Sequence, residues 1–145
     1  MLIGRHQAMA ALRTTGPADR LERSAYTLLS RIEAEGPMTI GGLAEAFSLD
    51  ASTVNRQTAA MLRQGLVERI PDPDGGLARK LRITDEGLRR LHADRDWAIA
   101  GLGGVLADWP ADEIADLARM LARLNASIER KEGRSWPRPP VVRAG

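Results

Sequence analysis

The sequence predicts a mainly α-helical protein that carries one small antiparallel β-hairpin. Apolar residues recur at helical spacing over most of the chain, whereas strand-like runs are confined to residues 66–70 and 79–83. A turn-rich stretch, Pro71-Asp72-Pro73-Asp74-Gly75-Gly76, separates these two runs. Aromatic residues make up only 3% of the chain, while alanine, leucine and arginine are abundant, as is typical of helical proteins.

Length and charge limit the class of protein. The 145 residues correspond to one domain that is large enough to bury a core. The formal net charge is only +2, although nineteen of the 21 basic residues are arginine and the isoelectric point is about 9.6. The net charge alone therefore does not indicate whether the protein binds nucleic acid. The positions of the charged residues along the chain are the more informative evidence.

Several classes are excluded by what the chain lacks. It has no cysteine, which excludes disulfides, thiol redox switching and thiolate metal sites. No apolar run approaches the roughly 18 residues of a membrane-spanning helix, and the N-terminus lacks the apolar segment of a secretory signal. We expect a soluble, cytoplasmic protein with no membrane partner.

Two helices are expected before the central region. Residues 2–12 form a short amphipathic stretch with Leu2, His6 and Met9 aligned. Residues 17–35 form a longer helix with Pro17 near its first turn, ended by Gly36-Pro37. The apolar face of this second helix comprises Leu21, Ala25, Leu28, Leu29 and Ile32.

A short helix and a tight turn are expected over residues 39–50. Thr39 is a suitable N-cap, although Gly42 stands where a complete capping box has Glu or Gln. Ser48-Leu49-Asp50 then supplies a turn of about three residues and, with Asp50, the N-cap of the next helix. Two short helices joined in this way form a helix-turn-helix. The buried side of the first helix comprises Ile40, Leu43, Ala44 and Phe47.

The second helix of this pair, residues 51–65, has one apolar and one polar face. Val54, Met61 and Leu62 form the apolar stripe, and no acid interrupts residues 51–67. Arginine can bind a guanine edge with two hydrogen bonds and asparagine an adenine edge, so this helix suits the major groove. A solvated helix face is the alternative for an isolated helix. The polar residues are Ser52, Thr53, Asn55, Arg56 and Arg63.

The hairpin that follows is half apolar and half basic. In residues 79–83, Leu81 and Ile83 lie on one face of the expected strand, while Lys80 and Arg82 lie on the other. The basic face is suited to phosphates. A hairpin directly after a helix-turn-helix makes the whole arrangement a winged helix-turn-helix.

Long helices are expected on the C-terminal side. Residues 84–106 form one helix, and a last helix begins near Pro110 and carries an almost heptad-spaced apolar seam. The seam comprises Ile114, Leu117, Leu121, Leu124 and Ile128. One winged domain cannot cover all of these apolar stripes, so we expect a twofold homodimer. Residues 132–145 are proline-rich, lack periodicity and are expected to be mobile.

Five short stretches of the central region match the pattern of one known family. They are Thr39-Ile40-Gly41-Gly42-Leu43-Ala44, Asp50-Ala51-Ser52-Thr53-Val54-Asn55-Arg56, Gly65-Leu66-Val67-Glu68-Arg69, Asp72-Pro73 and Ile83-Thr84-Asp85-Glu86-Gly87. In this order and at this spacing, over about residues 25–91, they resemble the MarR (multiple antibiotic resistance regulator) family of bacterial transcriptional regulators.

The resemblance implies one MarR-like domain over residues 1–131, with the winged helix-turn-helix at about 25–91 and dimerisation helices at about 2–24 and 88–131. It further implies double-stranded DNA as partner, a pseudo-palindromic operator, and a small aromatic or anionic effector that releases the regulator. One departure concerns the wing tip, where the family usually has an acid followed by arginines and this chain has Gly75, Gly76 and Leu77.

From the residues and the resemblance together, nine residues are predicted to bind DNA. Ser52, Thr53, Asn55 and Arg56 face bases or nearby phosphates, and Arg63 faces the backbone. The full set is Thr39, Ser52, Thr53, Asn55, Arg56, Arg63, Arg79, Lys80 and Arg82. Two other hypotheses stay open: a winged-helix module that binds protein, and an effector-binding dimer without operator binding.

Catalysis and cofactors are not expected. The serines lack the neighbouring histidine pattern of a nucleophilic site, and the glycines of residues 101–104 follow a helix rather than a strand, unlike a phosphate-binding loop. His92 and Asp96 lie four residues apart but offer only two ligands, so a solvated charge cluster is the simpler interpretation. We expect no enzyme activity, no cofactor and no metal.

Overall fold

The computed structural model describes residues 19–137 of the chain. The chain divides into two compact units, of which one spans Gly16–Asp96 and the other includes residues 97–137 of the described part. The expected helix over residues 2–12 and the final residues 138–145 lie outside the described residues.

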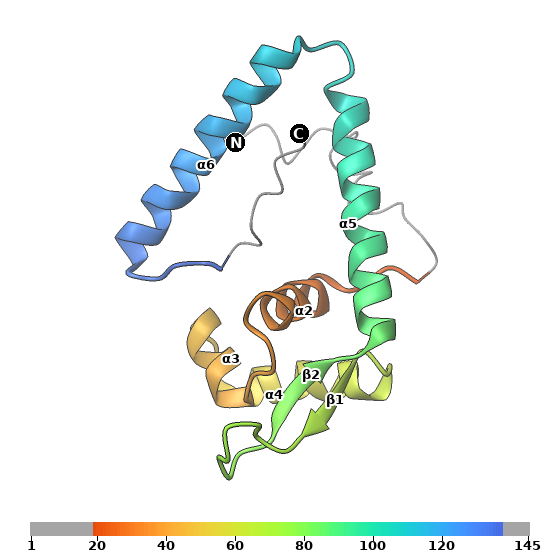
Figure 1. Ribbon diagram of the computed structural model, residues 1–145, viewed down its shortest axis with the longest axis vertical. Coiled ribbons are helices and arrows are strands. Elements are labelled where there is room, and N and C mark those ends of the chain that lie inside the picture. The colour runs from red at the N-terminus through yellow and green to blue at the C-terminus, as the bar shows by residue number, and fades with distance from the viewer. Residues whose placement is uncertain (1–18, 138–145) are drawn as a thin grey trace. The chain divides into compact units, whose positions relative to one another are not determined.

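The first unit is a winged helix-turn-helix, as predicted (Figure 1). Three helices surround an apolar core, and a two-stranded hairpin lies beside them before the chain enters a long helix. The elements are α2 (Arg23–Glu35), α3 (Ile40–Phe47), α4 (Ala51–Arg63), β1 (Val67–Ile70), β2 (Lys80–Ile83) and the first part of α5 (Asp85–Val105). Leu28, Leu29, Ile32, Leu43, Val54, Met61, Leu66, Leu81 and Leu91 form the centre of the core.

Helix α2 begins at Arg23, later than the expected start near Pro17. The reason is a contact that local sequence cannot reveal. The backbone N–H of Leu21 donates to Oδ2 of the buried Asp94, 3.0 Å away on α5. Because this bond holds Leu21 in the segment before the helix, the predicted helical periodicity of residues 17–22 is not realised as helix in the described residues from 19 onward.

The turn between α3 and α4 is built largely as expected. Thr39 Oγ1 accepts the N–H of Gly42 (2.9 Å), and Ser48 adopts a left-handed conformation with φ of 52°. Asp50 occupies the N-cap position of α4, but its side chain makes no capping hydrogen bond. Its carbonyl oxygen accepts the N–H groups of Thr53 and Val54 (3.0 and 3.2 Å), so Asp50 is the N-cap of α4, as predicted, through its backbone.

The hairpin is antiparallel, and its register pairs Glu68 with Arg82 and Ile70 with Lys80. Each strand is one residue shorter than predicted. β1 begins only at Val67 because the N–H of Leu66 still donates to Met61 O at the end of α4 (2.9 Å). Met38 adds a single bridge to Leu81, which ties the start of the helix-turn-helix to the hairpin. This bridge therefore joins the hairpin to the segment that precedes α3.

The second unit contains the rest of α5 and helix α6 (Ala111–Glu132), which begins directly after Pro110. Pro110 is therefore the N-cap of α6. None of the helices in residues 19–137 is both long and apolar enough to cross a membrane.

Apolar residues along these C-terminal elements are exposed in the single chain. Leu91 is buried, whereas Ile99 and Leu102, farther along α5, are exposed. The seam of α6 is exposed as well at Leu121, Leu124 and Ile128.

Candidate DNA-binding surface

The two faces of α4 are separated as the sequence predicts. Val54 and Met61 are buried, whereas Ser52, Asn55, Arg56 and Arg63 are exposed on the other side. The polar residues predicted for DNA recognition therefore lie together on the outward face, apart from Thr53, which is half-buried.

Sequence periodicity missed one buried polar residue in this helix. Thr58 is fully buried, and its hydroxyl donates to the carbonyl oxygens of Val54 (2.9 Å) and Asn55 (3.1 Å). A mid-helix threonine satisfies its hydroxyl in this way without leaving the helix, so no separate partner is needed. Thr58 can therefore be buried without leaving its hydroxyl unsatisfied.

The two arginines of α4 keep their charge available. Over residues 19–137, no acidic side chain lies within ion-pairing distance of Arg56 or Arg63. Thr39, at the N-terminus of α3, uses its hydroxyl as an acceptor for Gly42 N–H. The exposed face of α4 is thus polar and locally cationic.

We define the wing as residues 67–83. Its three predicted DNA-binding cations, Arg79, Lys80 and Arg82, differ in whether they have acidic partners. Lys80 pairs with Asp72 and Asp74, and Arg82 pairs across the strands with Glu68 (2.8 Å). Arg79 is exposed and, among the described residues, has no acidic partner. The structure therefore places the three predicted wing cations together on the hairpin, but two of them are already neutralised.

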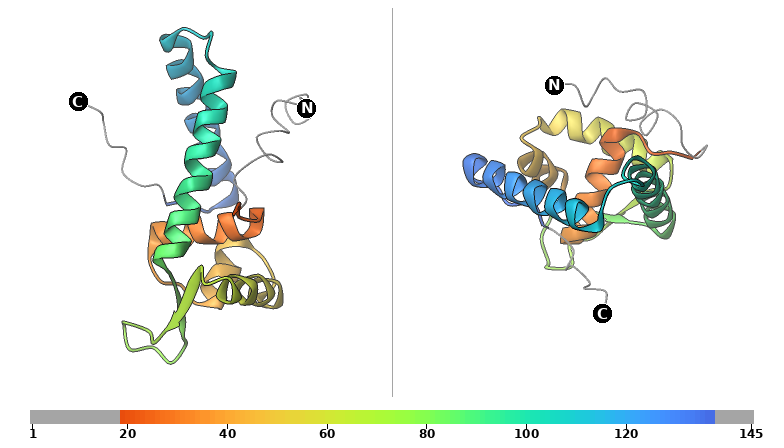
Figure 2. Two further views of the ribbon diagram at one scale, coloured as in Figure 1. Left: turned by 90° about the vertical axis from the view of Figure 1, so that its right-hand side faces the viewer. Right: turned by 90° about the horizontal axis from the view of Figure 1, so that it is seen from above.

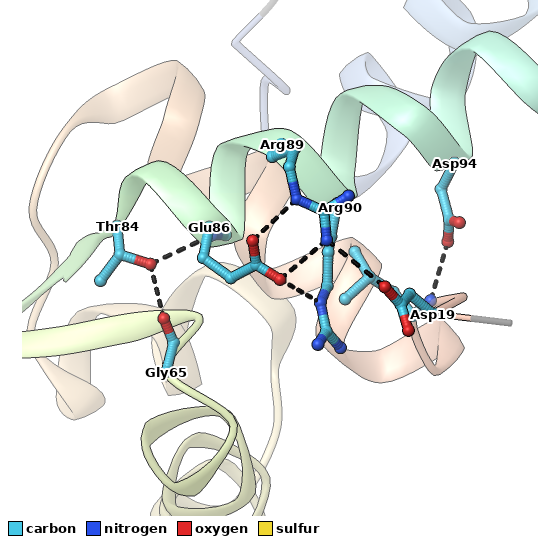
Figure 3. Close-up of polar contacts among 9 residues, drawn as sticks. Asp19, Gly65, Thr84, Glu86, Arg89, Arg90 and Asp94 are labelled. Carbon is cyan, nitrogen blue, oxygen red and sulfur yellow. Dashed lines mark hydrogen bonds and ion pairs between the residues drawn. The ribbon is translucent and has the colours of Figure 1, made fainter. Parts of the chain in front are cut away.

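A group of hydrogen bonds around Thr84, which we call the joint, connects the end of α4 to the start of α5 (Figure 3). The Thr84 hydroxyl donates to Gly65 O (2.6 Å) and accepts the N–H of Gly87 (3.0 Å), while Thr84 N–H donates to Leu66 O (3.1 Å). A Cβ at Gly87 would overlap Leu66 O, so only glycine allows this approach. These contacts fix the end of α4 to the start of α5.

The first turns of α5 neutralise two further arginines. The Glu86 carboxylate binds Arg89 (2.7 Å) and Arg90 (2.7 Å), as Figure 3 shows. Hydrogen bonds from Arg89 and then Arg90 lower the pKa of Glu86 to about 2. Asp19 lies 3.4 Å from Arg89 as well. Because both arginines are already paired with acids, we do not count them among the DNA contacts.

His92 lies in an ion-pair cluster between α5 and α2. Its Nε2 contacts Glu33 Oε1, and Arg95 binds the other oxygen of Glu33 (2.7 Å). Burial acts to raise the pKa of Glu33, but the hydrogen bonds from Arg95 and His92 outweigh it and lower the pKa below its usual value. Within the described part of the chain, no group of three or more His, Asp or Glu side chains is arranged to hold a metal ion.

A helix-turn-helix packed on a hairpin, with an open cationic face on its second helix, defines the class of winged helix-turn-helix proteins. Residues 21–75 match the MarR family. The chain is 36% identical over 108 residues to YxaD of Bacillus subtilis, described as an uncharacterized HTH-type transcriptional regulator, and the match covers 74% of this chain and 76% of YxaD. The chain belongs to the MarR family of transcriptional regulators.

Solved structures agree with this assignment. A MarR family protein from Bacillus stearothermophilus superimposes with a TM-score of 0.70 at 24% identity, over 86% of this chain and 84% of that one. The PcaV transcriptional regulator from Streptomyces coelicolor, solved with its natural ligand, gives a TM-score of 0.60 at 28% identity, over 85% and 87% of the two chains. The fold and family expected from the sequence are confirmed.

Proposed function

We propose that this regulator binds duplex DNA as a homodimer, with the α4 helices of the two subunits in successive major grooves of a pseudo-palindromic operator. The observation that carries the proposal is the exposed face of α4, where Asn55, Arg56 and Arg63 have no acidic neighbours among the described residues. A twofold protein reads a twofold site, so the half-sites lie about one helical turn, roughly 10 base pairs, apart.

The proposed contacts fall into two classes. Ser52, Thr53, Asn55 and Arg56, in the first half of α4, face base edges and adjacent phosphates. The backbone contacts are Thr39 at α3, Arg63 at the end of α4, and the wing. On the wing, Arg79 needs no rearrangement to bind a phosphate, whereas Lys80 and Arg82 already have acidic partners.

The dimer is supported by the apolar seam of α6. Leu121, Leu124 and Ile128 are about half exposed, and they repeat at three- and four-residue spacing on one helix face. A second copy of the chain offers a matching face, which would remove this surface from water. Residues 88–131 would then contribute to dimerisation.

A small-molecule effector is the remaining part of the proposal. PcaV, at 28% identity, was solved in complex with its natural ligand. We propose that a small aromatic or anionic molecule binds this regulator and lowers its affinity for DNA. Titrating aromatic acids into the protein while thermal unfolding is followed would detect such binding as a concentration-dependent rise in Tm.

Selection of duplexes from a random library tests the central claim. The full-length protein is immobilised and offered random duplexes of about 30 base pairs, which span two half-sites and their flanks. We expect enrichment of an inverted repeat whose binding weakens steeply with salt. Failure to enrich any sequence, together with salt-independent binding of a protein partner, would favour a protein-interaction module instead.

A further inference from the structure

The loop between β1 and β2, residues 71–79, has a defined shape and extends beyond the hairpin (Figures 1 and 2). Asp72 organises it with two backbone hydrogen bonds. Its Oδ1 accepts the N–H of Asp74 (3.0 Å), and its carbonyl oxygen accepts the N–H of Gly75 (3.0 Å). Gly75 has a φ of +82°, which favours glycine. The first half of the loop is therefore a closed turn.

The next residue leaves no room for a side chain. A Cβ at Gly76 would overlap Oδ2 of Asp72, so the backbone of Gly76 passes directly against this carboxylate. The Asp72 side chain is thus enclosed by its own loop and keeps only 13% of its exposure. A carboxylate that is shielded in this way needs a counter-charge.

Lys80, at the start of β2, supplies that charge. Its Nζ lies 2.7 Å from Asp72 Oδ1 and 2.8 Å from Asp74 Oδ2, and its side chain is only 19% exposed. The hydrogen bond to Lys80 is the main cause of a lowered pKa at Asp72, and the same bond raises the pKa of Lys80. Asp72 and Lys80 therefore both stay charged near neutral pH. We call Asp72, Asp74 and Lys80 the wing clamp.

Arg79 is in a different situation, although it is adjacent to Lys80. It is exposed, and none of the acidic groups described in residues 19–137 pairs with it. To reach a phosphate, Lys80 would have to leave two carboxylates unneutralised beside a polyanion, whereas Arg79 has no ion pair to break. The electrostatic cost falls on Lys80 alone.

We infer that Lys80 is a positioning residue that holds the wing loop in shape through the wing clamp, and that Arg79, rather than Lys80, binds the DNA backbone. This inference rests on the proposed DNA binding and assigns different roles to two neighbours that the sequence treats alike. The clamp connects the two ends of the loop. It therefore also determines the position of the fully exposed Leu77 at the tip of the loop.

A pair of variants separates the two roles through the salt dependence of binding. Arg79→Met removes a cation that has no acidic partner. The double variant Lys80→Met/Asp72→Asn removes the clamp while the net charge stays constant, and asparagine can still accept the Asp74 N–H. The probe is the duplex enriched from the random library, and the measured quantity is the slope of log Kobs against log salt concentration.

We expect Arg79→Met to lower the magnitude of the slope by about one, as for one lost phosphate contact. The charge-balanced double variant should keep the wild-type slope and lose about two- to fivefold in affinity, because the loop is less ordered. A loss of about one in the slope of the double variant, or an unchanged slope for Arg79→Met, would overturn the inference. A library that enriches no duplex would contradict the proposed DNA binding. In that case, whether the wing clamp forms is tested by a measurement that needs no DNA.

Lysine reactivity provides that second measurement, because the chain has only two lysines. The other is Lys131, which is exposed on α6 and serves as the internal reference. With trace acetic anhydride on the free wild-type protein, followed by mass spectrometry, Lys80 should acetylate more slowly than Lys131. Asp72→Asn should raise the rate at Lys80 and leave Lys131 unchanged. Equal rates in the wild type would show that the clamp does not form in solution.

Discussion

Two arginines on the exposed face of α4 are expected to have different effects on DNA binding. Arg56 lies in the first half of the helix, where we propose that it contacts a base edge, whereas Arg63 lies in the last turn. Arg56→Ala should cost about 1–3 kcal/mol on the selected duplex and relax its specificity. Arg63→Ala should weaken binding to all duplexes alike and lower the salt slope by about one.

Binding titrations on the selected duplex and on a random duplex, each at several salt concentrations, measure both effects. If the two variants changed the ratio of specific to non-specific affinity equally, the proposed division between base and backbone contacts would be wrong.

The wing tip offers a gain-of-function prediction. Leu77 is fully exposed at a position where the resembled sequences commonly have an arginine that enters the minor groove. Leu77→Arg should tighten binding and increase the salt slope by about one, most strongly for duplexes with A·T-rich flanks, because a narrow minor groove attracts cations. Leu77→Gln is the uncharged control. Equal affinities of wild type and Leu77→Arg on A·T-flanked and G·C-flanked duplexes would show that this loop stays outside the groove.

At the scale of elements, the joint between α4 and α5 depends on Gly87. A methyl group there would overlap Leu66 O and lie 2.9 Å from Ile83 Cγ1. Gly87→Ala should therefore destabilise the fold by about 1–3 kcal/mol, as other overpacked sites do. Gly103→Ala is the matched control in the same helix, because a Cβ there meets nothing within 4 Å.

The control should be neutral or stabilising by up to about 1 kcal/mol, since alanine is the better helix former. Urea unfolding of both variants at one protein concentration compares the two free energies of unfolding. A Gly87→Ala protein as stable as Gly103→Ala would mean that the joint can open without cost.

At the scale of the whole molecule, the exposed seam of α6 predicts a dimer. Leu124→Glu places a charge in the seam and should shift the protein to a monomer. Ala122→Glu adds the same charge to the same helix at an exposed position away from the seam, and it should leave the dimer intact. Light scattering at micromolar concentration gives the mass, and circular dichroism verifies that helicity is retained. A monomeric wild type of unchanged helicity would refute the proposed assembly.

Much of the fold follows from local patterns in the sequence. The order of the elements, the buried stripe of α4 and the Thr39 cap on Gly42 were all predicted, because helical period, strand alternation and capping depend on residues a few positions apart. The polar residues assigned to the outward face of α4, apart from the half-buried Thr53, were found there for the same reason. Burial of one stripe forces the other toward solvent.

Only the tertiary structure decided which polar groups far apart in the sequence meet. Glu68 and Arg82 are fourteen residues apart, and Leu21 and Asp94 are 73 residues apart, yet each pair meets at 2.8 and 3.0 Å respectively. No local period encodes such contacts. The same limit explains why Arg79 and Lys80 look equivalent in the sequence, although the course of the loop, set by Asp72, pairs only one of them with acids.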